Sequence, residues 1–291
     1  MSNSYNILKS HGFLYPRFRG FNSHVRMPWM LNGGKITSEE VIRDIEFQVN
    51  PLTHTIILSA EDFCLVQDAS FFSRLRERYD VSAVVYLKRQ DLWLESWYNQ
   101  HVKWPWDEKF SSSTPDEFLR RHDKDFSWID YYKLVKDIER RVGLGNLYVN
   151  VVDESGVKDT VGDFLNHLSI DPMWLNDYSD KNSSLSSAKL DILRRVDTYG
   201  LSGKARQRVI EALGSMEIEE DNGSKLVFDD SQVKRILSCY DESNRKVARE
   251  YFSRDRLFYD EVKLGRQPVF VSDERAYKYY IPQILKVLSD S

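Results

Sequence analysis

The fold is decided by residues 84–100, which read Val84-Val85-Tyr86-Leu87-Lys88-Arg89-Gln90-Asp91-Leu92-Trp93-Leu94-Glu95-Ser96-Trp97-Tyr98-Asn99-Gln100. The run from Ser82 to Leu87 is short, apolar and rich in β-branched and aromatic residues, which is typical of a buried strand in a parallel sheet. The residues that follow place apolar side chains on one face at helical spacing, namely Leu94, Trp97, Tyr98 and Val102. The stretch therefore predicts a strand, a tight turn and a helix in direct succession.

The turn between this strand and this helix carries two cations, Lys88 and Arg89. Ligands of open α/β sheets bind at the carboxyl ends of strands, where a helix amino terminus adds N–H groups and a partial positive charge. The turn therefore predicts an anion site, to which Ser96, about two helical turns further on, adds a hydroxyl if it faces the same ligand. The alternative interpretation is a basic surface turn before an amphipathic helix, with Ser96 merely exposed.

Two further apolar runs predict strands, one over 54–59 that ends in Ala60-Glu61-Asp62 and one over 147–152. A helical pattern over 71–79 lies between 54–59 and 82–87. Strand, helix and strand in this order predict a right-handed crossover and a parallel pair. The expected fold class is α/β, with one parallel sheet containing 54–59, 82–87 and 147–152, flanked by helices on both faces.

Helical patterns account for the remaining chain. Thr37-Ser38-Glu39-Glu40 is a capping box, and from about residue 172 onward only helical periodicity appears. No linker rich in Pro, Ser or Gly separates two domains. We therefore expect a single domain over 1–291, with an α/β core over 1–170 and a helical layer of the same domain over 171–291.

Composition excludes several classes of protein. Of 291 residues, 41% are hydrophobic and 30% are charged, which favours a well-cored globule over a disordered chain. The formal net charge of −4 argues against a dedicated nucleic-acid binder, and no apolar run is long enough to span a bilayer. Residues 1–12 lack a secretory signal, and Cys64 and Cys239 have no partner at metal or redox spacing. We expect a cytoplasmic, reduced and metal-free protein.

A basic segment near the amino terminus offers a second candidate ligand contact. It contains Arg17, Arg19, His24 and Arg26, interleaved with aromatic residues. One interpretation is a lip that meets an anionic or sugar ligand. The other is a solvated loop with aromatic side chains packed beneath it.

Residues 86–100 resemble the 3′-phosphate-binding segment of bacterial sulfotransferases, which use 3′-phosphoadenosine 5′-phosphosulfate (PAPS) on a P-loop-like α/β fold. Other stretches are similar to segments of the same family, in the same order and over nearly the whole chain: Gly12-Phe13-Leu14-Tyr15-Pro16 with His24, Ser59-Ala60-Glu61-Asp62-Phe63, Asp180-Lys181-Asn182-Ser183-Ser184-Leu185-Ser186 and Ser243-Asn244-Arg245-Lys246-Val247-Ala248-Arg249-Glu250-Tyr251-Phe252.

The resemblance implies a sulfotransferase that moves a sulfuryl group from PAPS to a hydroxyl acceptor such as a glycan, as in polysaccharide modification. Lys88, Arg89 and Ser96 are then the ligands of the 3′-phosphate in PAPS and in its product, adenosine 3′,5′-bisphosphate. Glu61 is the candidate base for the acceptor hydroxyl, and Asp62 competes for this role. The alternative is that one of the two residues caps the next helix. His24 is a candidate acceptor contact.

The chain departs from the family pattern at two places. Lys88 stands where the family usually has Arg, so the charge is kept but the planar fork that grips two phosphate oxygens is lost. The family also opens with a strand and a Lys-Thr-Gly-Thr-Thr-like loop that grips the 5′-phosphosulfate, whereas residues 1–16 resemble the segment that follows it. This departure supports a second hypothesis, a catalytically impaired relative that binds a nucleotide, an anion, a glycan or a partner chain and turns over very slowly.

Overall fold

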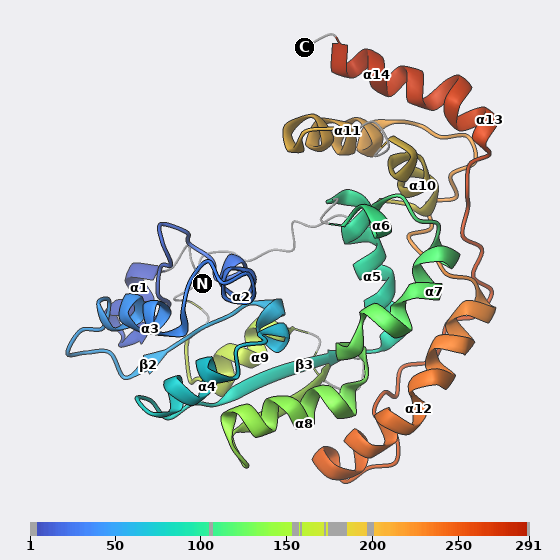
Figure 1. Cartoon of the computed structure of the whole chain (residues 1–291). Coiled ribbons are helices and arrows are strands. Elements are labelled where there is room, and N and C mark those ends of the chain that lie inside the picture. Colours follow the sequence, from blue (N-terminus) through green and yellow to red (C-terminus); the bar gives the residue numbers. More distant parts are fainter. Residues whose placement is uncertain are drawn as a thin grey trace. The chain divides into compact units, whose positions relative to one another are not determined.

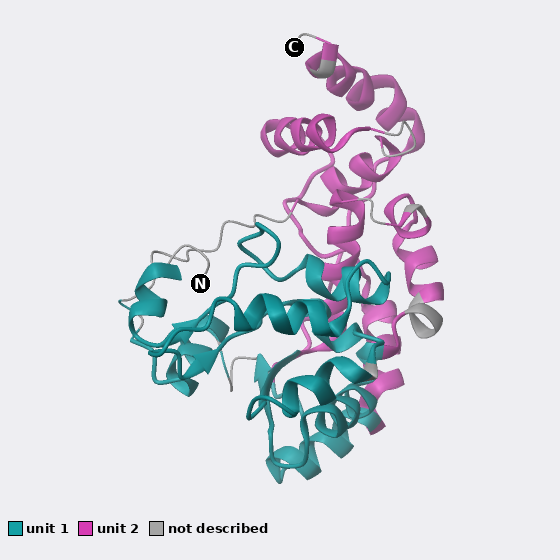
Figure 2. Cartoon of the chain, turned by 60° about the vertical axis from the view of Figure 1, so that its left-hand side comes forward, with its two compact units in different colours: residues 1–87, 128–179, 243–259 teal, residues 88–127, 180–242, 260–291 magenta. Residues whose placement is uncertain are grey.

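The computed structural model of the chain is built mainly from helices, with two short strand pairs (Figure 1). It describes residues 5–104, 107–152, 157, 159–171, 173, 185–196 and 201–289. The chain divides into two compact units, each assembled from three separate stretches (Figure 2). Unit 1 comprises 1–87, 128–179 and 243–259, and unit 2 comprises 88–127, 180–242 and 260–291. The stretches of the two units alternate along the sequence. The predicted single domain, with an α/β core over 1–170 and a helical layer over 171–291, stays a prediction.

The first strand pair of unit 1 joins β1 (Phe13–Leu14) to β2 (Thr55–Ile56) in parallel. The pairing continues beyond the strands, because the Ile57 N–H donates to the Leu14 carbonyl over 2.8 Å. One group of buried side chains around this pair comes from α1 (Tyr5–Ser10), α9 (Thr160–His167) and the strand segments: Leu8, Phe13, Tyr15, Ile57, Leu165 and Ile170. A second group, which Ile56 and Leu58 contact, comes mainly from α2 (Arg26–Asn32), α3 (Ser38–Glu46) and α4 (Ala69–Arg76).

The second strand pair joins β3 (Ala83–Lys88) to β4 (Leu147–Val152). The Ala83 N–H donates to the carbonyl of Asn146 over 2.8 Å, so the two strands start side by side and run parallel. Leu87 and Val151 are buried against α8 (Tyr131–Val142) and the last turns of α12 (Asp230–Phe252). This pair thus has its own apolar core within unit 1.

The structure confirms the α/β class and the parallel pairing, and it corrects the arrangement of the strands. The segments 54–59, 82–87 and 147–152 do not form one sheet within the described residues, because 55–56 pairs with 13–14 and 83–88 pairs with 147–152. Hydrophobic periodicity locates a strand but does not specify its neighbour. The two-residue strand Phe13–Leu14 is also too short to produce a pattern, and no strand was predicted there.

The local helix signals are confirmed. The Thr37 hydroxyl accepts from the Glu40 N–H at 3.2 Å, and the Glu40 carboxylate accepts from the Thr37 N–H at 2.7 Å, which completes the predicted capping box of α3. The α2 helix, in contrast, was not predicted; it begins at Arg26, the last basic residue of the segment that was interpreted as a lip or loop. Its seven residues are fewer than a periodicity window needs.

Unit 2 contains α5 (Gln90–Lys103), against which α6 (Glu108–Ser111) and α10 (Ser187–Val196) pack. Of the four residues predicted on its apolar face, Leu94, Tyr98 and Val102 are buried and Trp97 is half-buried. Tyr98 lies edge-on to Phe118 with the ring centroids 5.2 Å apart. The other helices are α7 (Pro115–Asp125), α11 (Gly203–Ser215), α13 (Asp273–Arg275), a π-helical turn (Ala276–Tyr280) and α14 (Ile281–Ser289). None of the helices in the described part of the chain is long and apolar enough to cross a membrane.

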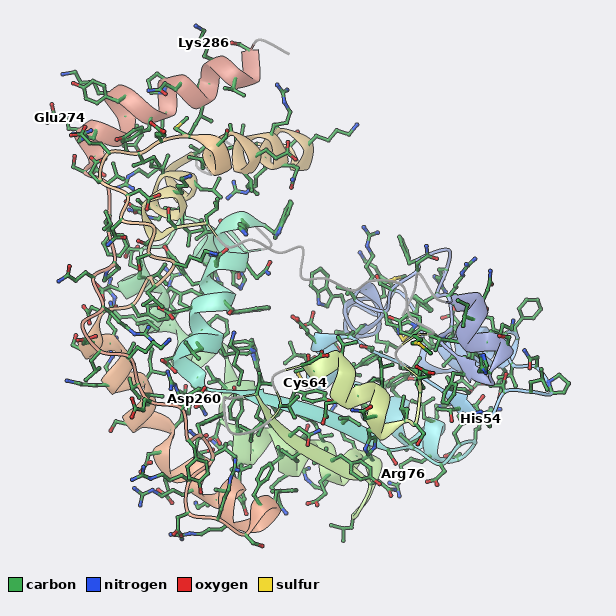
Figure 3. The ribbon with its side chains drawn as sticks, turned by 180° about the vertical axis from the view of Figure 1, so that it is seen from behind. His54, Cys64, Arg76, Asp260, Glu274 and Lys286 are labelled. Atoms are coloured by element: carbon green, nitrogen blue, oxygen red, sulfur yellow. The ribbon has the colours of Figure 1, made fainter. Side chains whose placement is uncertain are left out.

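Gly12 is required where α1 gives way to β1. Its φ is +81°, and a Cβ added there would lie 2.4 Å from the ring of His54 and 2.6 Å from the carbonyl oxygen of Leu52. His54, labelled in Figure 3, is held in place because its Nε2 contacts the carbonyl of His11 over 3.1 Å. Gly145 has the same φ of +81° but no heavy atom within 4 Å of such a Cβ.

We predict that Gly12→Ala lowers the free energy of unfolding by about 2–5 kcal/mol, since steric overlap adds to the backbone strain. Gly145→Ala should lower it by only about 1–2 kcal/mol, the cost of the left-handed backbone alone. Urea unfolding followed by circular dichroism measures both. Equal losses in the two variants would show that the contact with His54 does not matter.

Candidate functional site

Lys88 and Ser96, the two residues predicted to share an anion, lie in contact. The Lys88 ammonium donates to the Ser96 hydroxyl over 3.2 Å, and that hydroxyl donates to the Leu92 carbonyl over 3.0 Å. Lys88 is the last residue of β3, and Ser96 is exposed on α5. A cation that precedes the 14-residue helix α5 and a hydroxyl from its second turn therefore lie together, which is suitable chemistry for a phosphate or sulfate.

The Lys88 side chain is half-buried, and this burial lowers its pKa below the ordinary value of 10.5. The carboxylates of Glu95 and Asp91 act in the opposite direction and keep the ammonium form favourable. Burial also strengthens the attraction between an ammonium group and an incoming anion, because less water screens the pair. Lys88 is therefore positioned as a partly desolvated cation.

Arg89 was predicted as a second phosphate ligand, and the structure gives it other partners. Its side chain is buried and forms a two-point ion pair with Asp91, with Nε–Oδ1 at 2.7 Å and Nη2–Oδ2 at 3.1 Å. Its Nη1 donates to the backbone carbonyls of Asp260 and Glu261 over 3.1 and 3.3 Å. These contacts favour a structural role, in which Arg89 fixes the main chain next to Lys88.

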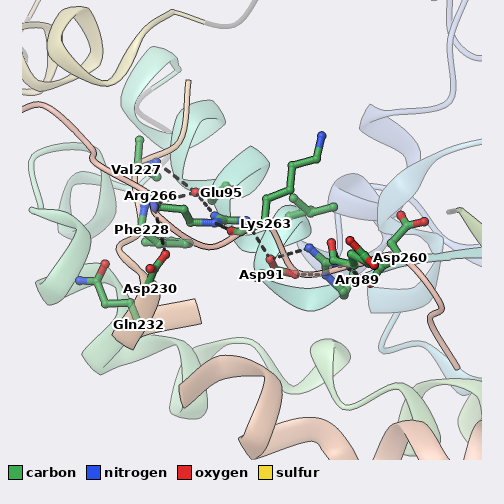
Figure 4. A network of polar contacts seen from close by, with 12 residues as sticks. Arg89, Asp91, Glu95, Val227, Phe228, Asp230, Gln232, Asp260, Lys263 and Arg266 are labelled. Atoms are coloured by element: carbon green, nitrogen blue, oxygen red, sulfur yellow. Dashed lines mark hydrogen bonds and ion pairs between the residues drawn. The ribbon is translucent and has the colours of Figure 1, made fainter. Parts of the chain in front are cut away.

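The Arg89–Asp91 pair extends into a buried network that contains Arg266 (Figure 4). The Arg266 guanidinium donates to Asp91 over 3.2 Å and to Glu95 over 3.0 Å, and all three side chains are buried. The network contains two cations, Arg89 and Arg266, and two carboxylates, so its formal charges balance. A buried charge is stable in a protein only when it is paired in this way.

Glu95 links the network to a third stretch of chain. Its Oε1 accepts from the N–H groups of Val227 and Phe228 over 3.0 and 3.2 Å. Burial raises the pKa of Glu95, while Arg266 and the two N–H groups lower it again. Glu95 therefore serves as a buried connector, although in the sequence it looked like an ordinary helical residue. Arg266 was missed because it lies in an irregular segment with no periodic signal.

The second group of predicted residues lies in unit 1, at the short 3₁₀ helix η2 (Glu61–Leu65). Glu61 begins this helix with its side chain reaching solvent, and loss of hydration together with the Asp62 charge raises its pKa. Asp62 accepts a 2.5 Å hydrogen bond from the indole N–H of Trp29. Burial raises the pKa of Asp62, and the Trp29 bond partly offsets this effect. Asp62 therefore contacts the indole of Trp29, and Glu61 is its neighbour in the chain.

His24, the predicted acceptor contact, is fully buried. Its Nδ1 accepts from the Ser59 N–H at 3.0 Å, so the ring carries its proton on Nε2, which donates to the Pro16 carbonyl over 2.7 Å. Burial lowers the pKa of His24 and keeps the ring neutral, against the smaller effect of these two bonds. This environment favours a structural role, in which the imidazole bridges the strand segments that follow β1 and β2.

The basic residues around His24 are mainly engaged locally. Arg17 stacks over the ring of Tyr5 at 4.6 Å, Arg26 lies over Phe21 at 4.4 Å, and Arg19 pairs with Glu40 over 3.1 Å. These contacts favour the solvated-loop interpretation of the segment. The predicted carboxyl-terminal signature over 180–184 lies outside the described residues.

Neither cysteine chemistry nor a metal cluster stands out among the described residues. No group of three or more His, Cys, Asp or Glu side chains in that part of the chain could hold a metal ion. Cys64, labelled in Figure 3, is half-buried, and burial near Asp62 raises the pKa of its thiol to about 12. A thiol with such a pKa is a poor nucleophile at neutral pH.

The chain is similar to a known protein over part of its length. The chain is 30% identical over 191 residues to an uncharacterized protein of Archaeoglobus fulgidus. The match covers 63% of this chain and 50% of the relative, so the chain spans about half the length of the curated protein it matches. No family model matches the chain. No solved structure matches it either.

We predict that Arg266→Met destabilises the protein by about 3–5 kcal/mol, because it leaves Asp91 and Glu95 buried with too little positive charge. The matched control is Lys278→Met, which removes an exposed pair with Glu274 at 4.0 Å and should cost under about 1 kcal/mol. Adding Glu95→Gln to Arg266→Met should recover part of the loss, since it removes one of the unpaired charges. Chemical denaturation measures each step, and a loss in Arg266→Met no larger than in the control would refute the network's role.

Proposed function

We propose that the chain binds a nucleotide with a 3′-phosphate and belongs to a PAPS-dependent sulfuryl-transfer system. The observation that carries this proposal is the 3.2 Å contact of Lys88, which precedes α5, with Ser96 in the second turn of that helix. The order of sequence segments that resemble bacterial sulfotransferases supports it. In this proposal Lys88 and Ser96 are the ligands of the 3′-phosphate, and Arg89 positions Lys88.

The transfer moves a sulfuryl group from the phosphosulfate to an acceptor hydroxyl. The sulfur–oxygen bond to the leaving phosphate breaks, a new sulfur–oxygen bond to the acceptor forms, and adenosine 3′,5′-bisphosphate departs. A base must take the hydroxyl proton, and Glu61 is the candidate from the resemblance; loss of hydration and the Asp62 charge raise its pKa, which makes it a stronger base. Positive charge near the leaving phosphates and in-line positioning supply the rest of the rate, as in phosphoryl transfer.

We predict that adenosine 3′,5′-bisphosphate binds and that Lys88→Ala weakens its affinity by about 1.5–3 kcal/mol, the range for hydrogen bonds to charged groups. Lys204→Ala, which removes an exposed cation from α11, is the matched control and should leave the affinity unchanged. Isothermal titration calorimetry measures both. Absence of binding at millimolar nucleotide, or equal affinities in both variants, would contradict the site.

The pKa of Lys88 gives this titration a second readout. Its pKa is lowered in the free protein, and a bound phosphate favours the ammonium form and therefore raises it. We predict that binding takes up protons at pH values between the pKa of Lys88 in the free protein and its pKa in the complex. Titrations in buffers of different ionisation enthalpy detect this uptake. Lys88→Ala should abolish it, and uptake that persists in this variant would assign the proton to another group.

We predict that Glu61→Gln slows sulfuryl transfer by ~10²–10⁴, the range for general base catalysis, without changing nucleotide affinity. Glu77→Gln, an exposed acid at the end of α4, is the control. Radiolabelled PAPS and a panel of hydroxylated acceptors provide the assay. Nucleotide binding without transfer to any acceptor would favour the non-catalytic relative, and transfer unaffected by Glu61→Gln would exclude Glu61 as the base.

A further inference from the structure

The loop between α3 and β2, residues 47–52, exposes its apolar side chains. Phe47 is 92% exposed, Leu52 is 66% exposed and Val49 is 40% exposed. Pro51 is exposed as well. A single exposed apolar side chain is ordinary in a folded protein, whereas four within six residues are not. We call these four residues the loop tip.

The polar side chains of the same loop are half-buried and hold its backbone in place. The Gln48 side-chain amide accepts from the Arg17 N–H and donates to the Arg17 carbonyl, both over 2.8 Å. The Asn50 side chain accepts from the Leu52 N–H at 2.8 Å, and the Thr53 hydroxyl accepts from the Asn50 N–H at 3.1 Å. The loop therefore has a defined shape in which the apolar groups face the solvent, the reverse of an ordinary surface loop.

Arginine side chains lie beside the loop tip. A hollow of about 370 Å³ is lined by Arg19, Glu40, Arg43, Asp44 and Phe47. Arg19 is paired with Glu40 over 3.1 Å. Arg43 lies one helical turn before Phe47, is exposed, and forms no ion pair with any residue that the structure describes. A guanidinium without a carboxylate partner is suited to bind the oxygens of a phosphate.

We propose that the loop tip inserts into the surface of a lipid bilayer that contains anionic phospholipids, with Arg43 at the phosphates of the headgroups. In a bilayer the hydrocarbon begins directly beneath these phosphates, so it accepts an apolar protrusion with cations at its base. Asp44 offsets part of the positive charge in the hollow. The apolar side chains therefore supply most of the affinity, and Arg43 favours anionic over neutral lipids.

A protein partner is the alternative that the experiment must separate. Stable protein interfaces involve about 20–30 residues on each side and bury a prominent side chain in a matching pocket. Here the apolar residues come from one loop of six residues, and the 92% exposure of Phe47 shows that this side chain protrudes. A bilayer accepts such a protrusion without a preformed pocket, which favours lipid as the partner.

The test is co-sedimentation of the whole chain with vesicles of phosphatidylcholine, alone or with about one third phosphatidylglycerol. We expect binding that is tighter to the anionic vesicles. Phe47→Ala should weaken it about tenfold or more, because a large apolar side chain no longer enters the hydrocarbon, and Phe47→Leu should retain most of it. Leu144→Ala is the matched control, since Leu144 is 86% exposed in the same unit and should not affect binding.

The contact of Arg43 with headgroups has its own readout. Arg43→Gln should weaken binding to the anionic vesicles about fivefold and leave binding to the neutral vesicles unchanged. Arg256→Gln, which removes an exposed cation elsewhere in unit 1, is the control. Added salt should reduce the preference for anionic vesicles, because it screens exposed charges. Equal binding to the two kinds of vesicle would refute the headgroup contact.

Three outcomes overturn the lipid inference as a whole. The chain binds neither kind of vesicle, or Phe47→Ala binds as well as the unaltered protein, or the chain forms a dimer that Phe47→Ala dissociates in sedimentation velocity. The last outcome would assign the loop tip to a protein interface. Thermal unfolding establishes that the variants are folded. No nucleotide is present in these experiments, so their results do not depend on the proposed phosphate site at Lys88.

Discussion

The buried ion pairs between α5 and the segment around Arg266 are the interaction on which unit 2 depends. Asp91 accepts from both Arg89 and Arg266, and Glu95 ties the same Arg266 to the backbone of Val227 and Phe228. Removing any one member strands a buried charge, which costs far more than loss of a surface pair. Because Lys88 directly precedes Arg89, the network that anchors Arg89 also determines where the candidate phosphate ligand stands.

Lys88 and Arg89 are adjacent basic residues with different roles, a candidate phosphate ligand and a structural anchor. The sequence alone did not distinguish these two roles. The contact of Lys88 with Ser96 was predictable, since it depends on local geometry, namely the end of a strand and the second turn of the helix after it. The role of Arg89 was not, because its partners Asp260 and Glu261 lie 171 and 172 residues away. An arginine whose partners are backbone carbonyls in an irregular segment leaves no pattern in a single sequence.

The same distinction between local and distant information applies to the fold. The strands at 55–56, 83–88 and 147–152 and the capping box at Thr37 follow from side-chain type and spacing over a few residues. The strand with which each of them pairs does not follow from this local information. Thr55–Ile56 pairs with a two-residue strand, Phe13–Leu14, whose existence depends on Gly12 turning the chain and on apolar side chains from α1 and α9 covering it. Tertiary packing, rather than intrinsic preference, makes so short a segment a strand.

His24 and Arg89 solve the same physical problem in the two units. Each is a buried side chain that bonds to the main chain near a solvent-accessible ionisable group: His24 holds the segment before Glu61, and Arg89 holds the segment after Lys88. A ligand-binding group needs both contact with solvent and a fixed position, and a single side chain rarely supplies both. Dividing these tasks between a buried anchor and an accessible neighbour leaves the accessible group only partly desolvated, so that its pKa is shifted while it keeps contact with solvent. We therefore interpret neighbouring polar residues at the end of a strand as a buried anchor and an accessible group, rather than as two members of one catalytic set.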